Sequence, residues 1–558
     1  MIRHRVFIFF TAIVIMLFIL FQFLMMNLIW SDNWVVNKST DDLRVEKLQD
    51  HPIKNGTKKG MYSYYVISSD SEAENFINIK RALELFKFSF EEFSSLNELP
   101  EAIPAYLTCI IICDGNLDLI GDMEILKRYL TAGVDSFFTN RFDVDSAVYQ
   151  QNTELFGIET NEGPYEQEGV DFLNDVLVSG LFFDADITED VNLVTLSGKC
   201  KVYAVGVDEN IKQYYDKNPI IWRTHLRDGG AMYFFNADLM KNFYNIGVFI
   251  GMLSSDKDDF IYPVVNASLI LLDGMPYLSN ENDSNMKNVY IRNTLQVQRD
   301  VIWNDLMAIT KGIKMKYTLY PKTGIGVDFY EKNFLQALGK EVYANNFEIA
   351  LYPSNNFNSI LKNYTPSAAM HYPSDKASSQ VVFNGYDFSF TNNTCINLPI
   401  ITEGHDLGKR EKYIGFSYAS ALGYFSHYLN LSDDIFGDTS GSDIWTDYKL
   451  KFVQGTYPVL KTYEYLTPET ASDTAKKMSA YLNCAPDYYI SRDDTSGAGT
   501  ITIKKQPEGT LSYMVKTVDK VVSAEGCEYL NVGRQYYFVT VTGDADAVLH
   551  IEKEDKTF

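Results

Sequence analysis

A long apolar segment at the start of the chain constrains where the rest of the protein can fold. Residues 6–30 are almost continuously apolar and follow two arginines and a histidine. About 20 such residues form a helix that spans a bilayer, and the basic flank predicts a cytoplasmic N-terminus. A cleaved signal peptide is the alternative, but this apolar region is longer than a signal core and no small-residue cleavage site follows it. We therefore expect a transmembrane helix within residues 1–30, an uncleaved anchor with the bulk of the chain extracytoplasmic.

Beyond the anchor, the composition is that of a folded and acidic protein. The 558 residues are 46% hydrophobic and 22% charged, a globular composition over a length that requires more than one domain. The formal charge of −24 argues against a nucleic-acid-binding surface. It suits a neutral or cationic partner, although solubility outside the cell explains the same charge at least as well.

Patterns along the chain divide the rest into four parts, of overall α/β class. Residues 31–60 are polar and lysine-rich, which is typical of a stalk. Residues 61–258 alternate strand-like and helical segments and predict a parallel sheet in an α/β domain. Residues 259–485 show the same alternation and predict a (β/α) barrel, whose site would lie at the carboxyl ends of its strands. Residues 486–558 carry short alternating segments and predict a small C-terminal β-domain.

The first of the folded parts resembles a flavodoxin or class I amidotransferase domain. Such catalysis needs a Gly-x-Cys-x-Gly nucleophile turn, and Cys200 is followed by Lys201 instead. We therefore expect a scaffold or binding module. Strands are predicted at 62–67, 107–113, 267–273, 315–320, 347–351, 500–504, 511–515, 536–541 and 547–551, and helices at 72–88 and 288–311.

Two strand ends in the barrel region carry the functional interpretation. The apolar run 267–272 ends in Asp273-Gly274-Met275-Pro276, and the strand at 347–351 continues into Tyr352-Pro-Ser-Asn-Asn356. This arrangement resembles polysaccharide deacetylases, in which one strand ends in a base aspartate and a metal-binding aspartate, and a later strand ends in His-x-x-x-His. The resemblance implies that Asp273 keeps the base position, whereas Gly274, Tyr352 and Asn356 replace the three metal ligands.

The order of the parts strengthens the resemblance. This order is similar to that of a bacterial family of extracytoplasmic proteins, some associated with Pel-type exopolysaccharide gene clusters. The parts are an anchor, an amidotransferase-like domain, a deacetylase-like barrel and a terminal β-domain. Matching segments cover most of the chain beyond the stalk: Ile261-Tyr-Pro263, Ala421 to His427 followed by Asp433-Asp434, and Tyr457 to Leu460 with Thr467 to Ser472. The resemblance implies partners among exopolysaccharide synthesis or export proteins.

The substituted ligands argue against ordinary deacetylation. In the active enzymes a metal polarises the acetyl carbonyl and lowers the pKa of its bound water. Glycine has no ligand atom, and neutral tyrosine and asparagine are poor zinc ligands, so we expect no metal and no other cofactor. A zinc site rebuilt from Asp273, His371, His405 and His427 is the alternative, although no pair of these has metal-motif spacing. His427 also aligns with a family position near the site and is a possible catalytic residue.

Aromatic residues supply a further signal, since the chain contains 38 Tyr, 36 Phe and 5 Trp and aromatic faces stack on sugar rings. Three functional hypotheses remain open. The first is a pseudoenzyme that binds or guides an exopolysaccharide, for example an amino-sugar polymer, with Asp273 as a relic base or a sugar contact. The second is a metal-dependent deacetylase with a rewired site, and the third is a non-catalytic assembly protein. The predicted sugar-binding residues are Tyr277, Tyr320, Tyr352, Asn356 and Trp445.

Overall fold

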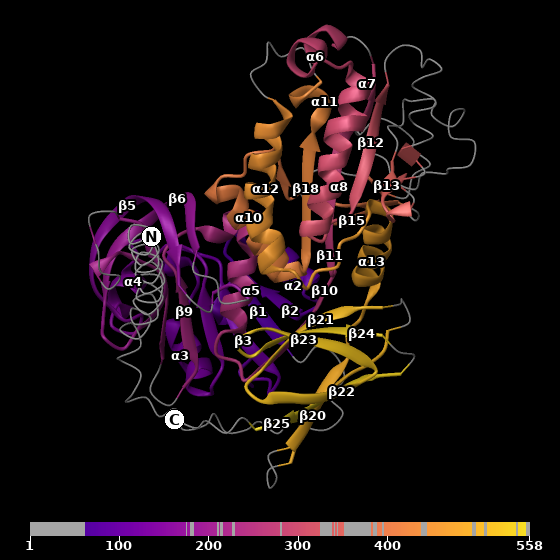
Figure 1. The fold of residues 1–558 in the computed structure, drawn as a ribbon. Coiled ribbons are helices and arrows are strands. Elements are labelled where there is room, and N and C mark those ends of the chain that lie inside the picture. The colour runs from indigo at the N-terminus through magenta and orange to yellow at the C-terminus, as the bar shows by residue number, and fades with distance from the viewer. Residues whose placement is uncertain are drawn as a thin grey trace, which may run out of the picture.

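The structure is a computed structural model that describes residues 62–553, apart from 174–175, 179–182, 209–210, 212–215, 226–228, 280–281, 324–337, 340, 343, 351–380, 383–387, 393–394, 437–443, 494–497, 507–509 and 543–544. The predicted anchor and stalk lie outside these residues. Within the described part of the chain, no helix is long and apolar enough to cross a membrane. The described elements form three packed parts, at the left, top and lower right of Figure 1.

The N-terminal part is built on a nine-stranded sheet of order β2-β1-β3-β4-β9-β8-β7-β5-β6. The strands from β2 to β9 are parallel, and the remaining ones are antiparallel. Helices α2 and α5 pack on one face and α3 and α4 on the other, because alternate side chains of β1 enter two different cores. The α/β class is confirmed, but the sheet is mixed and not parallel throughout as predicted. The likeness of this part to amidotransferases stays a prediction. The bounds are β1 (Ser63–Ile67), α2 (Glu74–Leu85), β2 (Ser89–Phe93), β3 (Leu107–Ile112), α3 (Met123–Thr131), β4 (Asp135–Phe138), α4 (Ala147–Asn152), β5 (Ile158–Phe172), β6 (Phe183–Leu196), β7 (Lys201–Gly206), β8 (Pro219–His225), β9 (Ala231–Phe235) and α5 (Ile246–Ser254).

The second part contains a five-stranded parallel sheet of order β13-β12-β11-β18-β17. Along the chain, β12 and then β13 follow β11 on one side of it. The later strands β17 and β18 lie on its other side, where β18 pairs with β11. This is the cyclic order of a (β/α) barrel, in which the last strand pairs with the first. The bounds are β11 (Ala267–Leu278), α6 (Asp283–Tyr290), α7 (Thr294–Val297), α8 (Trp303–Gly312), β12 (Tyr317–Thr323), β13 (Glu348–Ile349), β17 (Thr402–Glu403), α10 (Lys409–Leu422), β18 (Tyr424–Asn430), α11 (Leu431–Asp434), α12 (Trp445–Thr462) and α13 (Ala471–Asn483), with a small sheet of β14 (Val381–Val382), β15 (Ser389–Asn392) and β16 (Cys395–Asn397).

The helix predicted at 288–311 is divided in the structure. Helix α6 ends at Tyr290, the following Ile291 has a left-handed backbone, and α7 starts at Thr294. The Asn293 side chain accepts from the Gln296 amide and the Gln296 side chain caps Asn293 in return. This reciprocal capping box starts α7 and so ends the continuous pattern.

The terminal β-domain has two antiparallel four-stranded sheets. The strands predicted at 500–504, 511–515, 536–541 and 547–551 are confirmed. The predicted boundary at residue 259 is wrong, because strand Asp259–Val264 pairs with β21 of this domain and not with the barrel. Apolar residues mark a strand but do not reveal its sheet. The sheets are β10 (Asp259–Val264), β21 (Ser512–Thr517), β24 (Tyr536–Val541) and β23 (Cys527–Gly533), and β19 (Tyr488–Arg492), β20 (Ala498–Ile503), β25 (Ala547–Glu552) and β22 (Lys520–Glu525).

The three parts share one hydrophobic core. Polar contacts accompany this shared core, such as the Gly247 amide of α5, which donates to the Ser417 hydroxyl of α10 at 2.8 Å. The residues of the described hydrophobic cores all lie between Tyr62 and Ile551. A chain that starts at residue 61 therefore keeps all of the packing described here.

Candidate functional site

The centre of the candidate site is Asp273, which lies within β11 at the last position where this strand pairs with β18. The strand was predicted to end at Asp273 but continues to Leu278. Asp273 pairs in register with Tyr320 of β12 and Asn430 of β18, and its side chain is only 6% exposed. Its Oδ2 accepts a 2.7 Å hydrogen bond from the Tyr428 hydroxyl. Its Oδ1 is buried and has no hydrogen-bond partner among the described residues. A buried carboxylate oxygen without a donor is costly, so a donor group that reached Oδ1 would stabilise it.

Position 274 has no room for a side chain. Gly274 has a φ of +73°, and a Cβ added there would lie 2.6 Å from the backbone nitrogen of Ser432 and 2.7 Å from its Cα. Both contacts are with backbone, so a rotation of the Ser432 side chain does not relieve them. The surrounding fold therefore requires glycine at this position, to which the resemblance assigns the metal-binding aspartate.

The side chain of His427 does not lie on the same face of the sheet as that of Asp273. It pairs with Ile270 of β11, three residues before Asp273, and side chains alternate between the faces of a strand. The two residues therefore point to opposite faces of the sheet. The His427 ring stacks between the sheet and α12, 5.7 Å from the Phe452 ring, and its Nδ1 lies 2.9 Å from the Thr402 hydroxyl. His427 is a residue of the layer between the sheet and its outer helices.

Burial lowers the pKa of His427 to about 3, which predicts a structural role. Its folded pKa is depressed below the ordinary value near 6.5, so stability falls as the pH drops from 6.5 toward 3. At pH 7.5 we expect the free energy of unfolding of His427→Leu to lie within about 1 kcal/mol of that of the unmodified protein. At pH 5 we expect the variant to be more stable than the unmodified protein by about 2 kcal/mol. Urea unfolding at both pH values measures this. His550→Leu, at a half-exposed position, is the control, and a variant that unfolds at pH 7.5 contradicts the prediction.

His405 lies at the same end of the barrel as Asp273, after β17. Its ring stacks on Tyr448 of α12 with the centroids 4.3 Å apart, and its Nδ1 is 3.9 Å from Oδ2 of Asp434. Tyr448 donates to the same carboxylate at 3.2 Å. The neighbouring Asp406 pairs instead with Lys451 at 3.5 Å. Of the predicted histidines within the described residues, His405 is the one at the barrel mouth.

The described residues do not fit the metal triad of a deacetylase. They contain no group of three or more His, Cys, Asp or Glu side chains that could hold a metal ion. Gly274 offers no donor atom, and His427 faces away from Asp273. The remaining predicted ligand positions and sugar contacts, Tyr352, Asn356 and His371, lie outside the described residues.

The predicted aromatic sugar platforms are part of the core. Tyr320 and Trp445 are less than 2% exposed, and the Trp445 indole N–H donates to Asp305 at 2.8 Å. Tyr277 is 5% exposed and stacks on Phe436 at 5.1 Å. These rings are covered by protein and have no open face for a sugar.

Sequence analysis missed two residues of this site. Tyr428, which binds Asp273, follows His427 directly, and strand alternation puts it on the face that His427 does not share. Lys322, at the end of β12, lies 3.3 Å from both the Ser432 hydroxyl and the Asp433 carboxylate. Its ammonium thus lies beside the place that a side chain at position 274 would occupy. Only the pairing of β12 with β11 reveals this, so the sequence gives no signal for it.

Known structures of similar fold include a carbohydrate deacetylase. The crystal structure of Agd3, described as a novel carbohydrate deacetylase, is 10% identical with a TM-score of 0.52, and the match covers 88% of this chain and 99% of that chain. A ThuA-like protein from Bacteroides uniformis is 14% identical over 35% of this chain and 91% of its own, with a TM-score of 0.27. The alpha-L-fucosidase isoenzyme 2 from Paenibacillus thiaminolyticus is 12% identical over 35% of this chain and 34% of its own, with a TM-score of 0.24. Of these scores, only the first indicates a shared overall fold.

One protein family also matches. The model of a family described as an uncharacterised protein conserved in bacteria (DUF2194) matches residues 65–363, more than half of the chain. No protein of curated function matches the sequence.

Proposed function

The chain belongs to the bacterial family DUF2194, and we propose that it is a carbohydrate-binding protein that has the fold of a deacetylase without its metal chemistry. In full, the proposal is a membrane-anchored extracytoplasmic pseudoenzyme that holds or guides an exopolysaccharide beside the machinery that makes or exports it. The observation that carries it is Gly274, whose surroundings leave no space for a metal-binding side chain.

The barrel mouth retains groups that suit a polyhydroxylated ligand. Among the residues that the structure describes, no donor reaches the buried Oδ1 of Asp273, and sugar hydroxyl or amine groups are donors. Lys322 and Asp433 form an ion pair at 3.3 Å and are 45% and 67% exposed, so both are accessible to a ligand. Asp273 is then a sugar contact and not a base.

A deacetylase with a rewired site is the second candidate. Asp273 and His405 lie at the same end of the barrel. The Oδ1 atom of Asp273, which has no partner in the described part of the chain, is also what a catalytic base or metal ligand would present. This candidate needs a bound metal and acetate release, and the first candidate needs neither.

One set of measurements on the chain from residue 61 separates the candidates. Isothermal titration with acetylated and free amino-sugar oligomers measures binding, and metal analysis and an acetate assay measure chemistry. We expect binding, no stoichiometric metal and no acetate. Asp273→Asn should weaken binding about tenfold, since a hydrogen bond to a charged group contributes about 1.5–3 kcal/mol.

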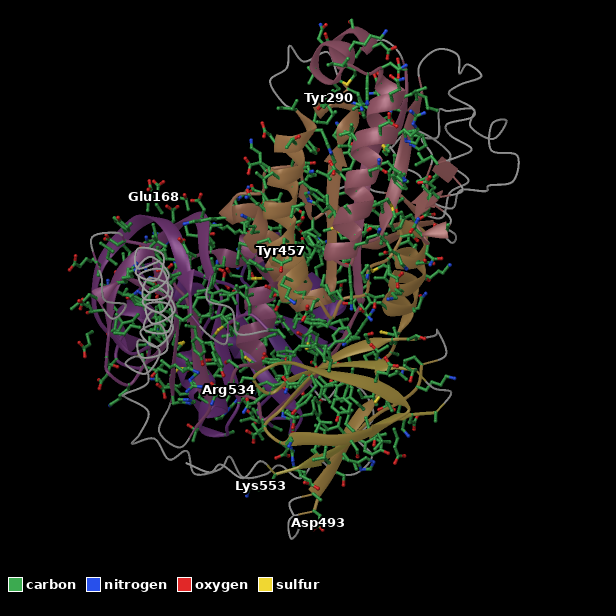
Figure 2. All side chains as sticks on the ribbon, in the orientation of Figure 1. Glu168, Tyr290, Tyr457, Asp493, Arg534 and Lys553 are labelled. Atoms are coloured by element: carbon green, nitrogen blue, oxygen red, sulfur yellow. The ribbon has the colours of Figure 1, made fainter. Side chains whose placement is uncertain are left out.

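The matched control is Asp493→Asn, an exposed aspartate at the far end of the terminal β-domain in Figure 2, which should bind normally. Acetate release that Asp273→Asn abolishes would establish the second candidate. A protein that binds none of the oligomers would overturn the first and leave the assembly role.

A further inference from the structure

One row of paired residues crosses the five-stranded sheet of the barrel on a single face. Side chains of residues that pair in register across a parallel sheet point to the same side. Taken strand by strand from β13 to β17, the row consists of Glu348, Thr318, Leu271, Tyr428 and Glu403. Asp273 follows Leu271 by two residues and lies on the same face, where Tyr428 donates to it. This face, which we call the carboxyl face, therefore carries three carboxyl groups.

Two of these groups are buried to the same extent but differ in their partners. Glu348 and Asp273 are each 6% exposed. One oxygen of Glu348 accepts from the Ser472 amide at 3.1 Å, and the other accepts from the Ser472 hydroxyl. Oδ2 of Asp273 accepts from Tyr428, but no donor among the described residues reaches Oδ1. The fold thus supplies both oxygens of Glu348 and only one of Asp273.

The lysine on this part of the carboxyl face does not supply the missing donor. Lys322 follows Tyr320 by two residues on β12, and its ammonium lies 3.3 Å from both the Ser432 hydroxyl and the Asp433 carboxylate. The third carboxyl group, that of Glu403, is exposed and has no ion pair among the described residues. The carboxyl face therefore keeps a negative charge that its own lysine does not neutralise.

The burial of Oδ1 restricts the kind of donor that a sugar can offer it. The N–H of an acetamido group lies between the sugar ring and the acetyl group, so it reaches a recessed oxygen poorly. A hydroxyl group and a protonated primary amine both project from the ring and can reach it. Of these two, the amine also carries the opposite charge, and a buried charge is stabilised chiefly by such a partner.

We propose that the carboxyl face binds the protonated primary amine of an amino sugar, with the ammonium on Oδ1 of Asp273. Glu403 adds a weaker attraction, because two strand spacings and two residues of rise place it about 12 Å from Asp273. This inference rests on the proposed carbohydrate binding and names the form of sugar selected, the free amine over the N-acetylated sugar. The rewired deacetylase requires the opposite preference, because its substrate carries the acetyl group.

Isothermal titration of the chain from residue 61 with matched oligomers tests the preference. The probes are short oligomers of glucosamine and of galactosamine, each as the free amine and as the fully N-acetylated form. At about pH 6 an amine whose pKa is near 8 is protonated. We expect the free amine to bind about tenfold more tightly than its N-acetylated form. Added salt should weaken the binding of the free amine and leave that of the N-acetylated form unchanged.

Asp273→Asn keeps the shape of the side chain and removes its charge. We expect it to weaken binding of the free amine about tenfold and binding of the N-acetylated form less than about twofold. Glu403→Gln changes an exposed residue and tests the charge without disturbing the core. It should weaken binding of the free amine about twofold at low salt and leave the N-acetylated form unaffected. Glu168→Gln, at an exposed position of β5, is the matched control and should bind both forms normally.

The outcomes separate this inference from the function on which it rests. Equal affinity for the two forms, or tighter binding of the N-acetylated form, would overturn the inference and leave carbohydrate binding intact. A folded Asp273→Asn protein that still prefers the free amine would overturn it as well. Binding of none of the oligomers would overturn both the inference and the proposed function.

Discussion

An aspartate restored at position 274 is expected to destabilise the barrel by about 4 kcal/mol and to recruit no metal. The left-handed backbone of Gly274 costs any other residue about 1–2 kcal/mol. Contacts near 2.6 Å with the backbone of Ser432 force β11 and α11 apart, and overpacking of this kind costs about 1–3 kcal/mol. A second buried carboxylate beside Asp273 adds charge repulsion.

Urea unfolding and metal analysis of Gly274→Asp measure both effects. Gly163→Asp is the matched control, because Gly163 also has a positive φ, +98°, but no atom lies within 4 Å of an added Cβ. We expect the control to lose about 1 kcal/mol of its free energy of unfolding, which is the cost of the left-handed backbone alone. A folded Gly274→Asp protein with one bound zinc would contradict our reading of the site.

The contrast between Asp273 and His427 defines how much of this site the sequence could predict. Residues 267–272 are a run of apolar residues, so a buried strand leading into Asp273 was predictable, although the strand continues to Leu278 in the structure. His427 was selected by residue type and by the resemblance. Which face it occupies depends on its register with Ile270, and register between strands far apart in sequence leaves no local pattern.

The aromatic candidates and β10 were misjudged for the same reason. Tyr277, Tyr320 and Trp445 were selected as aromatic residues near the predicted site. Whether an aromatic ring is packed in the core or open to a ligand depends on its tertiary neighbours. Strand Asp259–Val264 was not predicted as a strand, and its residues were assigned to the barrel although they pair with the terminal β-domain. The local sequence pattern predicts strands and helices, whereas pairing between distant strands determines which side chains meet at the site.

The second large effect concerns Glu189 of β6, a buried carboxyl group between the N-terminal sheet and α10. The side chain is 8% exposed, and its Oε1 has no hydrogen-bond partner among the described residues. Burial raises the pKa of Glu189 to about 7, with a further increase from the nearby carboxylates of Asp238 and Asp190 that Lys241 partly offsets. Tyr244 and Tyr413 complete its surroundings.

The direction of the pH effect follows from the raised pKa. An unfolded glutamate titrates near 4.5, so the folded state holds the proton more tightly. The contribution of Glu189 to stability is fully present below pH 4.5 and is lost as the pH rises to about 7. At about 1.36 kcal/mol for each pKa unit, the loss is about 3 kcal/mol.

Glu189→Gln should remove this loss, because glutamine resembles the protonated side chain and never ionises. We expect the free energy of unfolding of the variant to exceed that of the unmodified protein by less than about 1 kcal/mol at pH 5 and by about 3 kcal/mol at pH 8. Urea unfolding at both pH values measures these differences. Glu168→Gln, on the exposed edge of the neighbouring strand β5 in Figure 2, is the control and should change stability little at either pH. Equal stability of Glu189→Gln and the unmodified chain at pH 8 would mean that a donor or cation satisfies this carboxylate, and that the contact between the N-terminal sheet and α10 tolerates its charge.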